Sequence, residues 1–231
     1  MSDKLNKNGE YQRKFIANVS HDFRSPLTSI KGYVNAILDG TIPYEMQERY
    51  LKVIAFESTR LEKLTRSLLT LNELDVKKRM MHMRRFDINE TIRTTAATFE
   101  GTCSERNIRL ELLLAGKELF VRADMEQIQQ VLYNLLDNAV KYTQAGGTIN
   151  VSVAQWEMYV EIKVSDTGKG ISESNQASIF KRFYREEEIH NQPGVGIGLY
   201  LTREIVTQQG GYVTVESQVG KGSAFSIFLP R

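Results

Sequence analysis

The chain has 231 residues, a formal net charge of +2 and a hydrophobic fraction of 41%, which is enough apolar material for one or two globular cores. Nearly balanced charge argues against nucleic-acid binding, which usually needs a concentrated basic surface, and we interpret the basic runs at residues 77–79 and 84–85 as an exposed junction. Cys103 is the only cysteine, so one chain forms no internal disulfide and no multi-cysteine metal site, and a reducing compartment is expected.

Residues 12–38 predict a long helix, because their apolar side chains recur at alternating spacings of three and four. The stripe consists of Ile16, Val19, Phe23, Leu27, Ile30, Val34 and Ile37. A break at residues 39–43 precedes a second run of the same kind, so we expect an antiparallel helical hairpin. Two helices alone bury such stripes poorly, whereas two hairpins close a four-helix bundle. Packing alone therefore predicts a homodimer.

The rest of the chain predicts an α/β region with antiparallel character. Residues 87–90 fit a capping box that opens a helix toward Glu105, and Asp124 is expected to begin a helix that ends near Thr143. A further helix is expected after Pro193. Strands are expected over residues 107–114, 119–122, 147–154, 158–165, 211–216 and 224–229.

We place the domain boundary between Leu74 and Phe86 and assign residues 1–78 to the hairpin and residues 79–231 to the α/β domain. No run of about 18 apolar residues is present, and the start of the chain lacks the apolar segment of a signal peptide. We therefore expect a soluble protein. The helix near Tyr11 could also continue from a segment upstream of residue 1. The sequence leaves open whether this chain is a fragment of a longer protein.

His21 is the candidate reactive residue of the hairpin. At ~100° per residue it lies about 160° from the centre of the apolar stripe, so it points away from the predicted core. By itself this position suits an idle surface histidine. Its surroundings, residues 15–28 (FIANVSHDFRSPLT), resemble the phospho-acceptor box of sensor histidine kinases.

The chemistry of this box fits phosphoryl transfer. A neutral imidazole has a free lone pair for attack on phosphorus, and a pKa of about 6.5 supplies that form at neutral pH. Asp22 can hold or remove the proton of the other ring nitrogen, and the resemblance implies that it is the base. Ser25 lies one turn after His21, where the family often has Thr or Asn to position a water, so phosphatase activity toward the partner remains an option.

A nucleotide site is predicted in the α/β region, although no Gly-x-x-x-x-Gly-Lys-Ser/Thr loop occurs. Glycine-rich segments lie at residues 166–170, after a predicted strand, and at residues 194–199, before a helix. Asn134, Asn138 and Lys141 share one face of the helix that begins at Asp124. Amide oxygens suit Mg²⁺, and an ammonium group suits phosphate.

These segments resemble the N box and the glycine boxes of the ATPase fold shared by histidine kinases, type II topoisomerases, mismatch-repair ATPases and heat-shock chaperones, and residues 179–185 resemble the F box of the kinases. The resemblance implies an α/β sandwich with a mixed sheet, and ATP and Mg²⁺ as cofactors. It also implies that the nucleotide-binding residues are Asn134, Asn138, Lys141, Tyr142, Asp166, Gly168, Gly170, Phe183, Gly194, Gly196, Gly198, Leu199, Gly222 and Ser223.

The same resemblance assigns roles to some of these residues. Asp166 would accept a hydrogen bond from the adenine amino group, and Asn138, with Asn134 beside it, would bind Mg²⁺. Arg185 would contact the γ-phosphate or the His21 region, and a solvated charge is an equally good interpretation.

The resulting hypothesis is a cytoplasmic histidine kinase core that phosphorylates itself on His21 and passes the phosphoryl group to an aspartate of a response-regulator receiver domain. One alternative is an ATP-driven clamp without a phosphorylated residue. Another is a non-catalytic module that docks a regulator and senses ATP. The sequence leaves open the stimulus, the cognate regulator, a membrane anchor upstream, and transfer within or between protomers.

Overall fold

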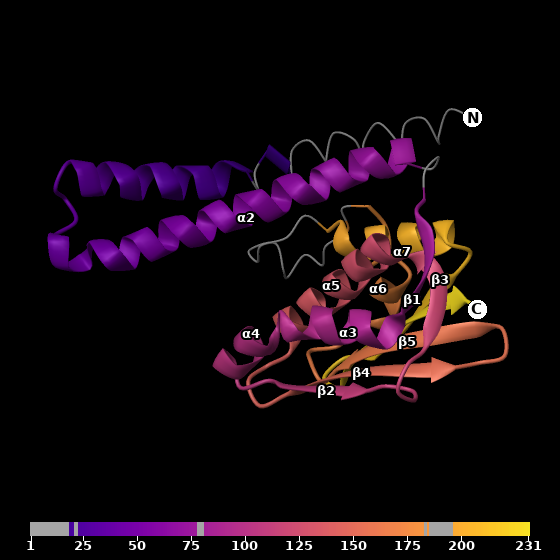
Figure 1. The fold of residues 1–231 in the computed structure, drawn as a ribbon. Coiled ribbons are helices and arrows are strands. Elements are labelled where there is room, and N and C mark those ends of the chain that lie inside the picture. Colours follow the sequence, from indigo (N-terminus) through magenta and orange to yellow (C-terminus); the bar gives the residue numbers. More distant parts are fainter. Residues whose placement is uncertain (1–18, 21–22, 78–80, 183, 185–195) are drawn as a thin grey trace. The chain divides into compact units, whose positions relative to one another are not determined.

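The computed structural model describes residues 19–20, 23–77, 81–182, 184 and 196–231 (Figure 1). It contains two compact units. One contains the described residues up to Leu74, and the other contains the described residues of Asp75–Tyr184 and Ile197–Arg231. Within the described residues, no helix is both long enough and apolar enough to span a membrane.

The first unit is a helical hairpin. Residues 23–38 are helical, and the second helix, α2, spans Tyr44–Lys77 (Figure 1). In the connecting turn, Gly40 has a φ of 77°, a left-handed conformation that glycine adopts without steric cost. Asp39 Oδ1 accepts a hydrogen bond from the Thr41 backbone N–H at 2.9 Å. The Thr41 side chain, and after it this backbone N–H, hold the pKa of the Asp39 carboxyl below its usual value.

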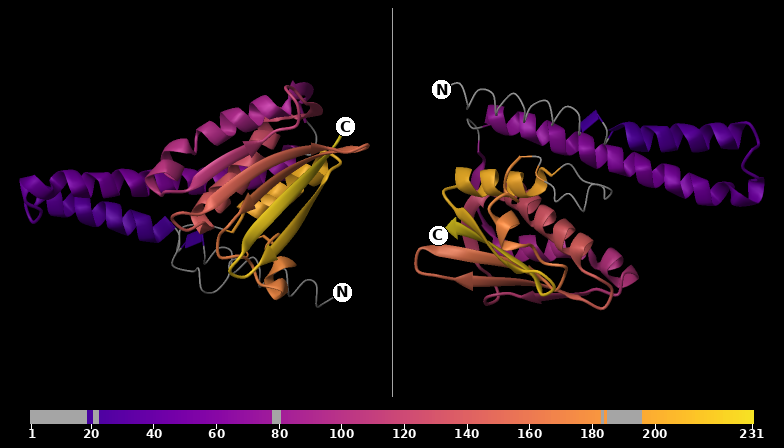
Figure 2. Two further views of the ribbon diagram at one scale, coloured as in Figure 1. Left: turned by 90° about the horizontal axis from the view of Figure 1, so that it is seen from below. Right: turned by 180° about the vertical axis from the view of Figure 1, so that it is seen from behind.

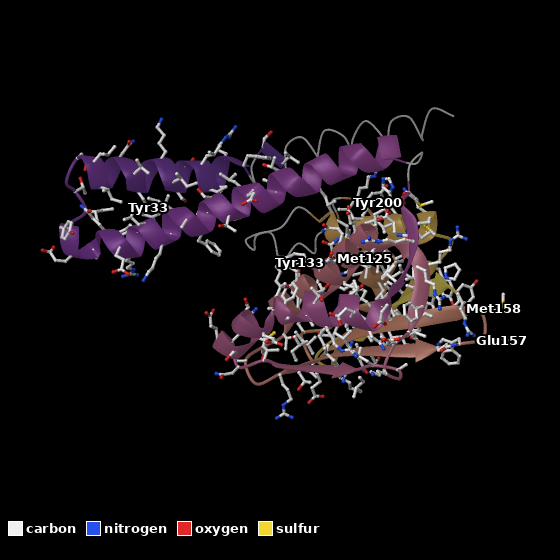
Figure 3. The ribbon with its side chains drawn as sticks, viewed as in Figure 1. Tyr33, Met125, Tyr133, Glu157, Met158 and Tyr200 are labelled. Atoms are coloured by element: carbon white, nitrogen blue, oxygen red, sulfur yellow. The ribbon has the colours of Figure 1, made fainter. Side chains whose placement is uncertain are left out.

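The apolar stripe of the hairpin is only partly covered. The rings of Tyr33, labelled in Figure 3, and Tyr50 lie 5.1 Å apart between centroids and join the two helices. However, Leu27, Val34 and Leu51 are 52%, 37% and 53% exposed. A single hairpin therefore leaves a row of apolar side chains without cover.

The second unit is built from strands and helices that follow one another along the chain. In order they are β1 (Met83–Asp87), α3 (Ile88–Ala97), α4 (Glu100–Glu105), β2 (Arg109–Leu113), β3 (Phe120–Asp124), α5 (Met125–Tyr142), β4 (Thr148–Gln155), β5 (Tyr159–Asp166), α6 (Glu173–Gln176), α7 (Gly198–Gln208), β6 (Tyr212–Gln218) and β7 (Gly222–Pro230).

Its main sheet has the order β2-β4-β5-β7-β6. Strand β2 runs parallel to β4, and the other neighbours are antiparallel, so the predicted mixed sheet is confirmed. Strands β1 and β3 form a separate antiparallel pair. The register of β5 and β7 places Asp166 directly opposite Ser223. This pairing positions the candidate nucleotide site.

Helices α3, α5 and α7 cover one face of the main sheet (Figures 1 and 2). Strands β4 and β5 alternate between buried and half-buried residues over most of their length, as expected when one face is covered. The core between the helices and the sheet includes side chains that are at most 1% exposed, among them Leu132, Leu135, Leu136, Ile162 and Ile227. This packing gives the elements around the candidate nucleotide site a rigid base.

Helix α5 begins and ends where the sequence predicts. Asp124 is the N-cap, and its Oδ1 accepts a hydrogen bond from the Gln127 backbone N–H at 3.2 Å. At the other end, the Arg106 guanidinium donates to the carbonyl oxygens of Val140 and Thr143. These bonds satisfy terminal carbonyls that lack partners within the helix.

Some local features differ from the prediction. Strand β1, which includes Arg84 and Arg85, was not expected, although both arginines are exposed, as a solvated junction requires. The helix predicted to run toward Glu105 is two helices, α3 and α4, with a break after Ala97. Asp87 caps α3 as expected, but Glu90 pairs with Arg93 instead of completing a capping box. The short helix α6 was not expected.

Candidate functional site

Asp166, the last residue of β5, is the centre of the candidate nucleotide site. Its Oδ1 accepts a hydrogen bond from the Gly168 backbone N–H at 2.8 Å, and the Ser223 backbone N–H also donates to the carboxyl group. Burial raises the pKa of Asp166 above its usual value, and the two backbone hydrogen bonds oppose that shift. The carboxylate is thus held in a fixed orientation. The hydrogen bonds offset part of the free-energy cost of burying its charge.

The glycines of this region allow several chain segments to approach Asp166 closely. A Cβ at Gly168 would lie 2.5 Å from the carbonyl oxygen of Tyr142, and one at Gly222 would overlap the backbone of Asp166. Gly170 has a φ of 71°, and a Cβ there would overlap the backbone of Gln218. Glycine is required at these positions because any side chain would separate β5, the end of α5 and the β6–β7 turn.

Two ammonium groups lie close to the ring of Tyr142. Lys141 Nζ is 5.0 Å and Lys169 Nζ is 5.3 Å from the centroid of its ring. These distances correspond to cation–π contacts. The structure thus brings together the predicted residues Lys141, Tyr142 and Asp166 with its neighbouring glycines, and it adds Lys169, which sequence reasoning did not single out.

Asn134 connects α5 to the beginning of α7. Its Nδ2 donates to the carbonyl oxygen of Gly198 at 3.3 Å, and its Oδ1 accepts a hydrogen bond from Gln130 Nε2 at 3.1 Å. One turn further along α5, Asn138 is half-buried, and no hydrogen bond to its side chain is found among the described residues. Asn138 therefore offers its amide oxygen to a metal ion more readily than Asn134 does.

A second layer of polar contacts, missed by sequence reasoning, holds the loop after Asp166. Ser217 of β6 accepts a hydrogen bond from the Ile171 backbone N–H at 2.8 Å. Gln176 Nε2 donates to the carbonyl oxygens of Ser217 and Ile171 at 2.9 and 3.2 Å. No motif marks these residues, because Ser217 and Ile171 are 46 positions apart in sequence.

The other predicted residues are less constrained by the structure. Gly196 has a φ of 69°, and Leu199 is half-buried in the first turn of α7. Ser25 is exposed on the first helix. A hollow on this helix is lined by Ser20, Phe23, Arg24, Leu27, Thr28 and Lys31. The predicted residues outside the described ones are His21, Asp22, Phe183, Arg185 and Gly194.

Comparison with known proteins accounts for both units. Residues 11–76 match the family model of the His Kinase A (phospho-acceptor) domain. Residues 123–231 match the model of the histidine kinase-, DNA gyrase B- and HSP90-like ATPase. A phospho-acceptor hairpin and an ATP-binding domain are thus present in one chain, in that order.

Individual proteins give the same result. The circadian input-output histidine kinase CikA of Synechococcus elongatus is 34% identical over 224 residues, which cover 94% of this chain and 30% of that protein. The structure of the histidine kinase AdeS of Acinetobacter baumannii matches with a TM-score of 0.73 at 25% identity, over 91% of this chain and 97% of that one.

The histidine kinase ThkA matches in two structures. Its catalytic domain is 30% identical with a TM-score of 0.60, over 65% of this chain and 96% of that domain. ThkA in complex with the response regulator protein TrrA matches with a TM-score of 0.75 at 27% identity, over 99% of this chain and 63% of that one. The chain belongs to the family of two-component sensor histidine kinases. It comprises the phospho-acceptor and ATPase domains that form the core of such a kinase. It spans 30–38% of the length of the curated relatives it matches.

Proposed function

We propose that this chain transfers the γ-phosphoryl group of ATP to His21 and then to an aspartate of a response-regulator receiver domain. The observation that carries the proposal is the presence, in one chain, of a phospho-acceptor match that includes His21 and an ATPase match that includes the Asp166 site. The hypothesis from the sequence therefore has support from two independent parts of the molecule.

The reaction exchanges one bond to phosphorus for another. A neutral nitrogen of His21 attacks the γ-phosphorus, the bond to the oxygen that bridges the β- and γ-phosphates breaks, and ADP leaves. Asp22 accepts or holds the proton of the second ring nitrogen as the imidazole becomes positively charged. An aspartate of the regulator then attacks the same phosphorus and frees His21.

The nucleotide site supplies binding and orientation. Asp166 accepts a hydrogen bond from the adenine amino group, and the close backbone approach at Gly168 and Gly170 shapes the pocket for the base. Tyr142, with Lys141 and Lys169 against its ring, borders the nucleotide. The backbone N–H groups at the start of α7, near Gly198, face the phosphates.

The residues of α5 fit Mg²⁺. An amide oxygen is a suitable hard ligand, and Asn138 carries one without a hydrogen bond to another described residue, whereas Asn134 would first have to release Gln130. We therefore assign the main contact to Asn138 and place Asn134 beside it. Bound Mg²⁺ would neutralise charge that develops on the phosphates.

A homodimer through the hairpin would cover the apolar side chains that one hairpin leaves exposed. Leu27, Val34 and Leu51 need such a partner, and pairing two hairpins into a four-helix bundle supplies it. A response regulator is the proposed second partner, because ThkA, which matches 99% of this chain over 63% of its own length, was solved in complex with one. We place the reaction in the cytoplasm, where ATP is available. Ser25 is compatible with phosphatase activity toward the regulator.

The test is to incubate the protein with γ-labelled ATP and Mg²⁺ and to follow label on the protein. We expect acid-labile, base-stable label that is absent from His21→Gln and from Asn138→Ala. Persistent label on His21→Gln would move the acceptor elsewhere. Steady ATP hydrolysis without labelled protein would instead favour an ATP-driven clamp.

A further inference from the structure

The hydroxyl group of Ser217 joins three parts of the nucleotide site. It contacts the Ile171 backbone N–H at 2.8 Å, the Gly222 carbonyl oxygen at 2.9 Å and the Ser223 hydroxyl at 2.9 Å. Ile171 lies in the loop that follows Asp166, and Ser223 lies opposite Asp166 on β7. One side chain thus connects both sides of the carboxylate.

Counting protons fixes the direction of these bonds. A hydroxyl group has one proton and two lone pairs. The Ile171 N–H can only donate, and the Gly222 carbonyl can only accept, so the Ser217 proton goes to Gly222 and one lone pair receives Ile171. The remaining contact can then form only if Ser223 donates its proton to the second lone pair of Ser217.

This direction determines what Ser223 can offer to a ligand. Its proton is used by Ser217, so its oxygen retains only acceptor capacity. Asp166 beside it is also an acceptor when ionised, and its carboxyl group already receives N–H bonds from Gly168 and Ser223. The two side chains therefore present acceptors, and no proton, to a base that binds between them.

We propose that Ser217 is a specificity-determining positioning residue, which turns the Ser223 proton away from the site so that Asp166 and Ser223 select a purine with a 6-amino group over one with a 6-oxo group. The proposal rests on the nucleotide site of the proposed function. An amino group donates to both acceptors, whereas a carbonyl oxygen would face them without a shared proton, which is costly in a partly buried site.

Gln176 provides a matched control. It holds the same loop through the carbonyl oxygens of Ile171 and Ser217, and the structure gives it no contact with the Ser223 hydroxyl. Its loss loosens the loop but leaves the direction of the Ser223 proton unchanged. A purely structural role of Ser217 would make Ser217→Ala behave like Gln176→Ala.

The experiment measures dissociation constants of ADP and of inosine diphosphate, which carries a carbonyl oxygen in place of the amino group, by calorimetry on the full chain. In Ser217→Ala the Ser223 hydroxyl is free to turn and donate to that carbonyl. We expect the ratio of the inosine to the adenosine constant to fall about fivefold, the equivalent of one hydrogen bond. In Gln176→Ala both constants rise together and the ratio stays that of the wild type.

A double-mutant cycle tests the route of the effect. Ser223→Ala removes the hydroxyl, so adding Ser217→Ala to it should change the ratio no further. An unchanged ratio in Ser217→Ala, or an equal fall in Gln176→Ala, would overturn the inference while leaving ATP binding intact. Failure of the wild type to bind ADP would instead contradict the proposed function.

Discussion

The two units of this chain solve the problem of burying apolar residues in different ways. In the α/β unit, side chains such as Leu132, Ile162 and Ile227 are at most 1% exposed. In the hairpin, Leu27 and Leu51 remain more than half exposed. The α/β unit has a core of its own, whereas the apolar stripe of the hairpin is covered only when a second surface packs against it. We expect ligand binding to depend on the former and assembly on the latter.

The largest effect should come from a charge placed on the exposed stripe of the hairpin. Leu51→Glu would bury a carboxylate in the proposed four-helix bundle, and we expect at least a hundredfold weaker dimerisation in sedimentation experiments, since an unpaired buried charge costs several kcal/mol. ADP affinity should stay unchanged, because the α/β unit has its own core. The matched control is Lys52→Glu on the solvent-exposed side of α2. A monomeric wild type would show that the hairpin finds another partner.

Asp166→Asn should act on the α/β unit instead, so that ADP binding weakens. The substitution removes the charged acceptor for the adenine amino group, and a hydrogen bond to a charged group contributes about 1.5–3 kcal/mol, so ADP affinity should fall about 10- to 100-fold in calorimetry. Thermal unfolding without nucleotide should show equal or higher stability, because the cost of burying the charge is removed. Loss of stability together with affinity would assign Asp166 a structural role.

Arg106→Ala should lower the stability of the α/β unit alone. The guanidinium caps the last turn of α5 through the carbonyl oxygens of Val140 and Thr143, and losing these bonds should cost about 1–2 kcal/mol in denaturant unfolding. Dimerisation through the hairpin should not change. Arg93→Ala, at an exposed pair with Glu90, is the control and should stay within about 0.5 kcal/mol.

The smallest effect concerns pH. Burial raises the pKa of Asp166 in the free protein, and ADP needs the ionised form, so ADP affinity should decline as pH falls through that raised pKa. The stability of the free protein should respond with the opposite sign. A folded-state pKa above the unfolded value favours folding as pH decreases through the interval between the two. Calorimetry and unfolding as functions of pH should show both trends, and Asp166→Asn should remove them.

The sequence predicted the elements whose signals are local. Asp124 as an N-cap, the 3–4 spacing along α5 and the alternation in β4 and β5 each depend on neighbouring residues. Strand β1 was missed because, among the described residues, it pairs with β3 alone, more than 30 residues away, and its arginines remain exposed. The break between α3 and α4 falls at Thr98 and Phe99, which contain no proline or glycine, and Gly101 alone near the break did not indicate it.

For the candidate site, the close backbone approaches were predictable from the sequence, and the side-chain contacts were not. The glycine boxes indicated where the backbone comes close, and Gly168, Gly170 and Gly222 do make such approaches. The role of Ser217 depends on the pairing of β6 with β7 and on a loop from a distant part of the chain. A serine in an alternating strand gives no signal of that kind.

The position of β7 has a consequence for how the protein is made. This strand is the last of the sheet in sequence order, yet it lies between β5 and β6 and supplies Ser223 opposite Asp166. A nascent chain that has emerged only as far as β6 therefore has a gap in the sheet and an apolar layer on α5 and α7 that is partly uncovered. The candidate nucleotide site cannot form before β7 has been synthesised, so premature termination before Gly222 should yield a chain that depends on chaperones and does not bind ATP.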